Sequence, residues 1–281
     1  MAADATAPPV SDSVPPMRLQ GATVLLTGAS GGLGRAMARA LDARGARLLL
    51  SARREDVLQQ ISAELGGRPE TLPADLSDPP AAATLAERAG EVDVLVANAG
   101  VPASGRVERF STREIDIALD VNLRAPIQMT RSLLPGMLER RSGHLLYVAS
   151  LSGKVASPRG SLYSATKFGL RGFAAGLRED VEPRGIGVTV VYPGFISGAG
   201  MFAESGAKLP SWVGTRTPQQ VADAVVGAIE GNKAEVDVAP LVLRAGSLVA
   251  SLAPVTVGRL QRRLGSVRIA DDLAEGQRPK G

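Results

Sequence analysis

Thr27-Gly28-Ala29-Ser30-Gly31-Gly32-Leu33-Gly34 links a short apolar run, residues 22–27, to a helical pattern over residues 33–44. In such a turn Gly28 allows a sharp change of direction, Gly32 lets a pyrophosphate approach the backbone, and Gly34 lets the helix pack on the sheet. The first helical turn then points its N–H groups at the phosphates. The stretch therefore predicts a dinucleotide-binding turn, which also includes Ser30, Gly31 and Leu33.

The same alternation of apolar run and helical pattern continues along the chain. Short apolar runs predict strands at residues 22–27, 47–51, 93–97, 143–150 and 187–192. Helical patterns occupy residues 33–44 and 54–65, and lie near residues 111–141 and 160–182. Strand and helix in alternation predict a parallel sheet with helices on both faces. We expect an α/β fold of the Rossmann type, a doubly wound sheet of about seven parallel strands in a three-layer α/β/α single domain.

The two ends of the chain differ from this pattern. Residues 1–20 carry four prolines and no apolar run, which predicts a disordered N-terminal tail before a catalytic domain over residues 21–239. Residues 240–281 predict a helical C-terminal extension, apolar and then polar, with a frayed end from Asp271. Arg244 and Pro254 interrupt its apolar part, 240–265, so that it cannot span a bilayer. We expect this part to pack on its own domain, and an oligomer contact or a membrane-surface segment are the alternatives.

Composition excludes several classes of function. A chain of 281 residues with 44% hydrophobic residues can bury one large core. The net charge of +4 arises from basic residues scattered among 28 acidic ones, so we expect no nucleic-acid partner. The absence of cysteine and the single histidine predict no metal site and no thiol catalysis. With no signal peptide at the N-terminus, we expect a cytoplasmic protein.

Arg53 follows the second predicted strand, where the residue that contacts the adenosine ribose is expected. An acidic residue there would accept the 2′-hydroxyl of NAD, whereas an arginine pairs with the 2′-phosphate of NADP. We therefore expect NADP rather than NAD. The alternative is that Arg53 and Arg54 are a solvated helix start, although positive charge is unfavourable at a helix N-terminus.

The glycine-rich turn also permits a second interpretation. Gly28-Ala29-Ser30-Gly31-Gly32 fits the Gly-x-Ser-x-Gly nucleophile elbow of serine hydrolases, which stands between a strand and a helix. A hydrolase needs a histidine that reaches the serine, and His144 is the one histidine of the chain. His144 begins a predicted strand, where we expect it to face solvent or a neighbouring strand. The hydrolase is therefore the disfavoured alternative.

Tyr163-Ser164-Ala165-Thr166-Lys167 places a phenol and an ammonium four residues apart, on one face of a predicted helix. A phenol with a pKa of about 10 is a poor base at neutral pH, and a nearby ammonium is expected to lower that pKa. Tyr163 is then the acid/base, and Lys167 tunes it. Ser150, at the end of the preceding strand, would donate a hydrogen bond to the substrate oxygen as charge develops there.

These motifs together resemble the short-chain dehydrogenase/reductase family, over about residues 21–238. The matching pieces, in the order of the family, are Thr27-Gly28-x-x-x-Gly32-x-Gly34, Asp75-Leu76, Asn98-Ala99-Gly100, Asn122, Ser150, Tyr163-x-x-x-Lys167 and Pro193-Gly194. The resemblance implies that Asn122 holds a water in the proton relay. It also implies that Tyr163 and Lys167 contact the nicotinamide ribose.

Further cofactor contacts follow from the same resemblance. Asp75 and Leu76 are implied to contact the adenine, although Asp75 could instead cap the next helix. Asn98, Ala99 and Gly100 are implied to line the adenosine ribose. Pro193, Gly194 and Ile196 are implied to flank the nicotinamide. Gly198 stands where many members have threonine, which is a departure from the pattern.

The function expected is hydride transfer between NADP and a carbonyl or secondary alcohol of a small, apolar substrate. A flexible segment near residues 197–216, with Met201, Phe202, Leu209 and Trp212, is expected to cover that substrate. Relatives often pair through their long helices, so a homodimer or homotetramer is expected. The alternative function is a non-catalytic, NADP-binding regulatory or scaffold protein of the same fold.

Overall fold

A seven-stranded sheet forms the centre of the computed structural model, which describes residues 14–210, 213–263 and 266–277. The strands follow the order β3-β2-β1-β4-β5-β6-β7, and each neighbouring pair is parallel. Their bounds are β1 (Thr23–Thr27), β2 (Arg47–Ser51), β3 (Glu70–Thr71), β4 (Val94–Ala97), β5 (Gly143–Val148), β6 (Ile186–Pro193) and β7 (Glu235–Val238). The order reverses between β1 and β4, which opens a crevice at the carboxyl ends of these strands.

The expectation of a doubly wound parallel sheet is confirmed. Five of its strands are the apolar runs of the sequence, whereas β3 and β7 were not located there. β3 has only two residues, and β7 reads Glu-Val-Asp-Val at the edge of the sheet, so neither carries a buried apolar run.

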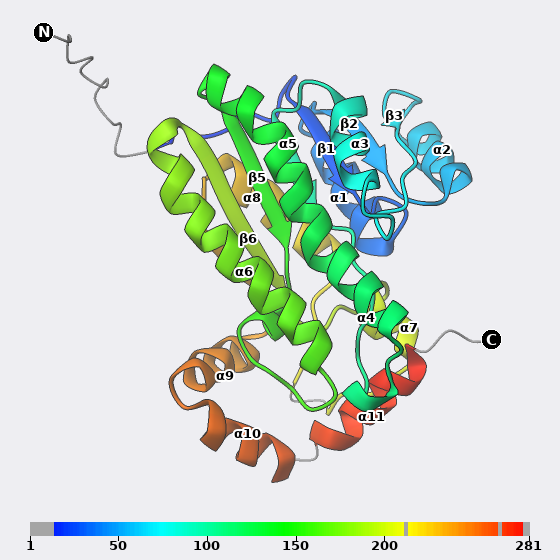
Figure 1. Cartoon of the computed structure of the whole chain (residues 1–281), viewed down its shortest axis with the longest axis vertical. Helices are drawn as coiled ribbons and strands as arrows, with labels where there is room; N and C mark the ends of the chain where they lie inside the picture. The colour runs from blue at the N-terminus through cyan, green and yellow to red at the C-terminus, as the bar shows by residue number, and fades with distance from the viewer. Residues whose placement is uncertain (1–13, 211–212, 264–265, 278–281) are drawn as a thin grey trace, which may run out of the picture.

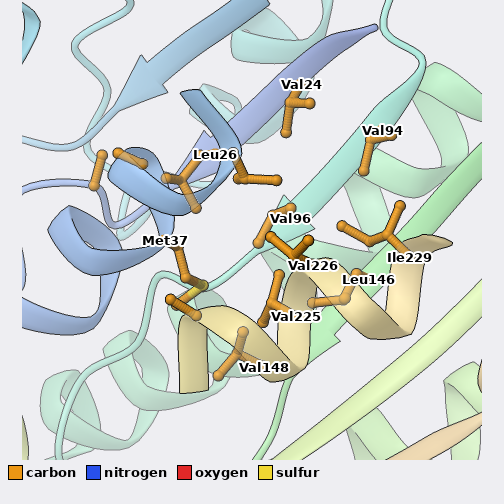
Figure 2. Close-up of a cluster of buried hydrophobic side chains, with 14 of the residues drawn as sticks. Val24, Leu26, Met37, Val94, Val96, Leu146, Val148, Val225, Val226 and Ile229 are labelled. Carbon is orange, nitrogen blue, oxygen red and sulfur yellow. The ribbon is translucent and has the colours of Figure 1, made fainter. Parts of the chain in front are cut away.

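Successive side chains of each strand point to opposite faces of the sheet, so they contribute to two separate hydrophobic cores. On β1, Val24 and Leu26 join the core beneath α1 (Gly32–Asp42), α2 (Glu55–Glu64) and α8 (Pro218–Glu230), while Leu25 joins the opposite core. Figure 2 shows the first core, in which Val225 and Val226 of α8 lie on the side chains of β1, β4 and β5. The second core lies under α3 (Ala81–Ala89), α5 (Ala125–Arg140) and α6 (Ser161–Val181). Helices therefore cover both faces of the sheet (Figure 1).

The helical stretch expected near 111–141 is interrupted. It consists of α4 (Thr112–Leu119), a π-helical segment Asp120–Arg124, and α5. Asn122 lies in the π segment, and both polar atoms of its side chain bond the backbone of Val101, across the crevice. π segments often accompany functional sites because the extra residue re-aims neighbouring groups.

The remaining α-helices belong to the C-terminal part of the chain. They are α7 (Met201–Ser205), α9 (Leu241–Leu252), α10 (Pro254–Arg263) and α11 (Ser266–Gly276), with short 3₁₀ turns at Val107–Arg109, Leu151–Gly153 and Glu182–Arg184. Figure 1 shows α9, α10 and α11 together at the lower end of the molecule.

The structure corrects the expected ends of the domain. Of the predicted tail, residues 1–13 lie outside the described residues. The rest is irregular, yet Leu19 is buried and Met17 packs on the core, so the domain begins before Gly21. At the other end, the fraying expected from Asp271 is wrong through Gly276, since these residues belong to α11.

The extension is helical as expected, but its apolar part does not pack as expected. Of the side chains described in α9, only Ser247 and Ala250 are buried, whereas Leu248 and Leu252 face outward. No helix within the described ranges is both long and apolar enough to span a bilayer.

His144 faces a neighbouring strand, which is one of the two expected positions, and not solvent. Its side chain is 1% exposed, and its Nε2 lies 2.9 Å from Thr189 Oγ1 on β6. His144 belongs to the first residues of β5, whereas Ser30 follows the last residue of β1. Since all strands are parallel, the two residues lie at opposite ends of the sheet, and the serine hydrolase alternative is wrong.

Candidate active site

The predicted site residues gather at the carboxyl ends of the strands. The glycine turn follows β1, Arg53 follows β2, Asn98 follows β4, Ser150 follows β5, and Gly194 follows β6. Neighbouring parallel strands end on the same edge of a sheet, so these loops surround one crevice. Asn122, Tyr163 and Lys167 enter the crevice from the π segment and from α6.

The glycine turn is tightly packed against the strands. Gly28 has a φ of +66°, and a Cβ on it would lie 2.8 Å from the Cα of Ala99. A Cβ on Gly34 would lie 2.2 Å from the carbonyl oxygen of Gly28, so α1 can approach β1 only with glycine there. The N-cap of α1, Gly31, makes no side-chain cap and no acidic residue occupies the first turn. Its N–H groups can therefore serve an anionic ligand.

A threonine hydroxyl holds the glycine turn to the next loop. Thr27 Oγ1 accepts the N–H groups of Asn98 and Ala99, each at 3.1 Å. The Asn98 amide donates in return to the carbonyl oxygens of Thr27 at 3.0 Å and Gly28 at 3.2 Å. Asn98 thus orients the backbone of the turn. This role of Thr27 was not predictable from its local sequence, since its hydroxyl bonds residues 71 and 72 positions away.

The basic side of the crevice lies at β2 and β3. Arg53 is exposed and makes no ion pair within the described residues, although its charge helps to lower the pKa of Asp75. Burial of Asp75 opposes that shift, and hydrogen bonds from Ser77 support it. Asp75 Oδ1 accepts from the Ser77 backbone and hydroxyl, at 3.0 and 2.8 Å, so it closes a turn and does not cap α3, whose N-cap is Pro80. Leu76 is buried beneath this loop.

Ser150 and Tyr163 form a hydrogen-bonded pair. Ser150 Oγ accepts the backbone N–H of Ser152 at 3.1 Å, which leaves the serine proton for another acceptor. Burial raises the pKa of Tyr163 to about 12, and the hydrogen bond with Ser150 lowers it in part. A hydrogen bond donated by Ser150 would stabilise the phenolate form of Tyr163.

Lys167 reaches the same space from one turn further along α6. Its side chain is 3% exposed, and Nζ donates to the carbonyl oxygen of Val148 at 3.1 Å and lies 5.7 Å from the centre of the Tyr163 ring. Burial lowers the pKa of Lys167 to about 8. The expected lowering of the Tyr163 pKa is therefore absent from the structure, since burial raises that pKa and the ammonium is directed at Val148.

Asn122 bonds the loop that follows β4. It is fully buried, Oδ1 accepts the N–H of Val101 at 2.8 Å, and Nδ2 donates to the carbonyl oxygen of Val101 at 3.0 Å. Its side chain therefore holds the loop after β4 in place. Oδ1 can accept and Nδ2 can donate one further hydrogen bond each.

The segment after β6 covers the crevice. Pro193 ends β6, and Gly194 donates its N–H to the carbonyl oxygen of Val238 at 3.0 Å. Ile196 is buried and pairs with Arg216, which brings the two ends of residues 197–216 together.

Between these ends, the segment lies on the glycine turn and on the loop after β4. A Cβ on Gly32 would lie 2.2 Å from the Cβ of Ala199, and one on Gly100 would lie 3.6 Å from Met201 Cε and 3.9 Å from Lys167 Nζ. Phe195 and Phe202 pack with their ring centres 5.0 Å apart. Trp212 lies outside the described residues. Met201 therefore brings an apolar side chain beside the amine of Lys167.

A polar cluster behind Ser150 was missed by the sequence analysis. Lys154 is tied to Asp237 Oδ1 at 2.7 Å and to Glu235 Oε2 at 3.0 Å, and its Nζ lies 4.0 Å from the centre of the Tyr192 ring. The cluster fastens the turn that carries Ser150 to the edge strand β7. Its other members lie 38 to 83 positions from Lys154 in the sequence, so no local pattern could reveal the cluster.

Within the described ranges, no group of three or more His, Cys, Asp or Glu side chains could hold a metal ion.

The C-terminal helix α11 contributes an ion pair that was not predicted from the sequence. Arg159 Nε lies 2.5 Å from Asp271 Oδ1. α11 also packs on α7, where Gln277 Nε2 donates to the carbonyl oxygen of Met201 at 3.5 Å. The loop before α6 and the segment over the crevice thus meet the same helix.

Comparison with known proteins identifies the family of the chain. A family model described as short chain dehydrogenase matches residues 22–210. The ketoacyl reductase HetN of Nostoc is 36% identical over 271 residues, which cover 92% of this chain and 94% of that protein. A short-chain dehydrogenase structure from Streptomyces avermitilis aligns with a TM-score of 0.74 at 30% identity, over 88% of this chain and 97% of the other.

A third relative carries a bound cofactor. The structure of a metagenomic short-chain oxidoreductase in complex with NADP aligns with a TM-score of 0.66 at 30% identity, over 79% of this chain and 97% of the other. The family model covers more than half of the chain, and the sheet order, the glycine turn and the Tyr-x-x-x-Lys helix agree with it. The chain belongs to the short-chain dehydrogenase/reductase family of oxidoreductase enzymes.

Proposed function

We propose that this enzyme is NADP-dependent and transfers a hydride between the nicotinamide and a carbonyl or secondary alcohol of a small, apolar substrate. Tyr163 is its acid/base, and Ser150, Lys167 and Asn122 complete the catalytic group. The single observation that carries the proposal is that Ser150, Tyr163 and the Lys167 amine lie together at the crevice where the strand order reverses.

The residues present fit a dinucleotide. The uncapped N-terminus of α1 offers N–H groups to phosphates, and Gly28 and Gly34 let the turn and the helix lie close to the strands. Arg53, with no ion pair within the described part of the chain, would meet the 2′-phosphate of NADP. Asp75, Leu76 and the loop Asn98-Ala99-Gly100 would line the adenosine. The relative solved with NADP supports this choice over NAD.

At the other end of the crevice, Pro193, Gly194 and Ile196 would flank the nicotinamide. When bound, the nicotinamide supplies or accepts the hydride. In carbonyl reduction Tyr163 gives its proton to the substrate oxygen, and a pKa of about 12 keeps that proton in place at neutral pH. The Ser150 hydroxyl can donate its proton to the substrate oxygen as negative charge develops there.

Lys167 has two expected tasks. Its ammonium stabilises the phenolate that remains after proton transfer, and its N–H groups bond the nicotinamide ribose. Asn122 holds the loop after β4 through Val101, and a water held by Asn122 would return the proton to Lys167. The apolar side chains of Met201 and Phe202 favour an apolar substrate. The name of the Nostoc relative, a ketoacyl reductase, supports carbonyl reduction as the direction.

Tyr163→Phe tests the catalytic role. We expect NADPH-dependent reduction of a ketone panel, followed by absorbance at the nicotinamide band, to fall by about 10² to 10⁴, the usual contribution of a general acid. NADPH binding, followed by fluorescence titration, should change little. Retained turnover would remove Tyr163 from the mechanism. Undetectable turnover of the unaltered chain on a broad panel, with tight NADPH binding, would favour the regulatory or scaffold alternative.

Arg53→Asp tests the cofactor. Replacing a cation by a carboxylate should repel the 2′-phosphate and accept the 2′-hydroxyl, so the ratio of NADPH to NADH affinity should fall by at least about tenfold. Arg54→Asp is the matched control, because Arg54 is exposed on the next position. An equal change in both variants would refute the contact assigned to Arg53.

A further inference from the structure

The side chains of α9 face the wrong way for a helix that packs only on its own domain. The inward positions hold Ser247 and Ala250, which are 5% and 4% exposed. The outward positions hold large apolar residues, of which Leu248 is 68% exposed and Leu252 is 83% exposed. A surface helix of a monomeric protein normally turns its large apolar residues inward.

The outward apolar residues form one continuous stripe. At 3.6 residues per turn, the exposed leucines and valines of α9 span an arc of about 120°. The stripe consists of Leu241, Val242, Leu248, Val249 and Leu252, and Val255 on α10 extends it. These six are among the eight large apolar side chains classed as exposed in the described part of the chain. Apolar residues that collect in this way mark an interaction surface.

The charge around this stripe has one sign. Residues 240–270 contain five arginines and no lysine, aspartate or glutamate. Arg244 is exposed beside the stripe, and Arg259 is exposed one turn after Val255 on the same face of α10. Neither makes an ion pair with another described residue. The docking partner must therefore offer both an apolar layer and negative charge.

We infer that α9 and α10 dock on the surface of an anionic phospholipid bilayer, with the stripe among the acyl chains and Arg244 and Arg259 on the lipid phosphates. A helix that lies in the membrane interface has this pairing of an apolar face with flanking basic residues. A second copy of the chain fits less well. Two-fold pairing of the stripes would bring the arginines of both copies together without any acidic residue to offset them.

The position of α9 gives the docking a consequence for the site. α9 begins after Ala239, whose Cβ would lie 3.0 Å from a Cβ on Gly194, in the loop after β6. α10 and α11 continue around the same end of the molecule, where α11 packs on α7 (Figure 1). Docking would therefore hold the segment over the crevice close to the lipid. The inference itself concerns binding and does not depend on the proposed reaction.

Vesicle co-sedimentation of the full chain tests the inference. We expect the protein to sediment with vesicles of phosphatidylcholine and phosphatidylglycerol, and to remain in solution with vesicles of phosphatidylcholine alone. Leu252→Glu should weaken binding at least about tenfold, since it removes a leucine that would lie among the acyl chains and adds a carboxylate. Arg259→Gln should weaken binding about fivefold, and added salt should weaken it further.

Matched controls stand elsewhere on the surface. Val107→Glu alters a valine that is 59% exposed outside the stripe, and is compared with Val255→Glu, at 65% exposed. Arg131→Gln alters an exposed arginine of α5, and is compared with Arg259→Gln. Both control variants should sediment like the unaltered chain. Thermal melts confirm that each variant is folded, which solvent-facing substitutions should permit.

Three results would overturn the inference. The first is no sedimentation with either vesicle. The second is equal binding to both vesicle types, or equal losses in the control and stripe variants. The third is a fall in solution mass on Leu252→Glu without any vesicle binding by the unaltered chain, which would assign the stripe to contacts between copies.

Discussion

His144 should make the fold sensitive to mild acid. Burial, helped by the charge of Arg178, lowers the pKa of His144 from 6.5 to about 3. Thr189 Oγ1 donates to the carbonyl oxygen of Lys233 at 2.6 Å, so it accepts from His144, and the imidazole is neutral with its proton on Nε2.

The size of the effect follows from the two pKa values. The folded chain keeps His144 neutral, while the unfolded chain binds a proton below pH 6.5. The stability that depends on the neutral form is therefore complete above pH 6.5 and is lost as the pH falls toward 3. Between about pH 7.5 and about pH 5 the loss amounts to about 2 kcal/mol in the free energy of unfolding.

Urea unfolding of the unaltered chain and of His144→Gln measures this loss. The glutamine amide can still donate to Thr189 but does not titrate, so the difference in free energy between the two proteins should shrink by about 2 kcal/mol from about pH 7.5 to about pH 5. Thr189→Val is the control, since it breaks the hydrogen bond and keeps the imidazole. Parallel pH curves for the unaltered chain and His144→Gln would refute the assignment.

Two further outcomes concern the site. Because burial lowers the pKa of Lys167 to about 8, kcat/KM for carbonyl reduction should fall as the pH rises through about 8. Lys167→Arg should move this alkaline fall in kcat/KM to higher pH. If the fall stays at the same pH in the variant, Lys167 is not the group that titrates. Asp271→Asn removes the partly exposed ion pair with Arg159, so KM for an apolar ketone should rise about two- to fivefold with kcat nearly unchanged. An unchanged KM would mean that α11 does not hold the loop before α6 in its working position.

The comparison of expectation and structure separates local from distant causes. A glycine turn between strand and helix, and a phenol four residues from an amine, are patterns within a few residues. Gly28, Gly34, Tyr163 and Lys167 were therefore identifiable in the sequence, as were the fold class and the family. The strands that the sequence located are those with buried apolar runs, and β3 and β7 escaped because edge strands need no such run.

Other features depend on contacts between distant segments. The direction of the Tyr163 pKa shift is set by how many side chains surround the phenol, and the position of the Lys167 amine by the carbonyl oxygen of Val148. Asn122 forms a hydrogen bond with Val101 across the crevice, and Arg159 pairs with Asp271, which lies 112 positions later in the sequence.

The sequence by itself determined the order of the elements, the glycine turn and the residues offered for catalysis, because each is a property of neighbouring residues. Only the tertiary structure decided which side chains are buried and therefore how they ionise, that His144 is buried and neutral, and that α9 turns its leucines outward. Burial and hydrogen-bond partners depend on the whole packing of the chain, and residue types along a segment do not specify them.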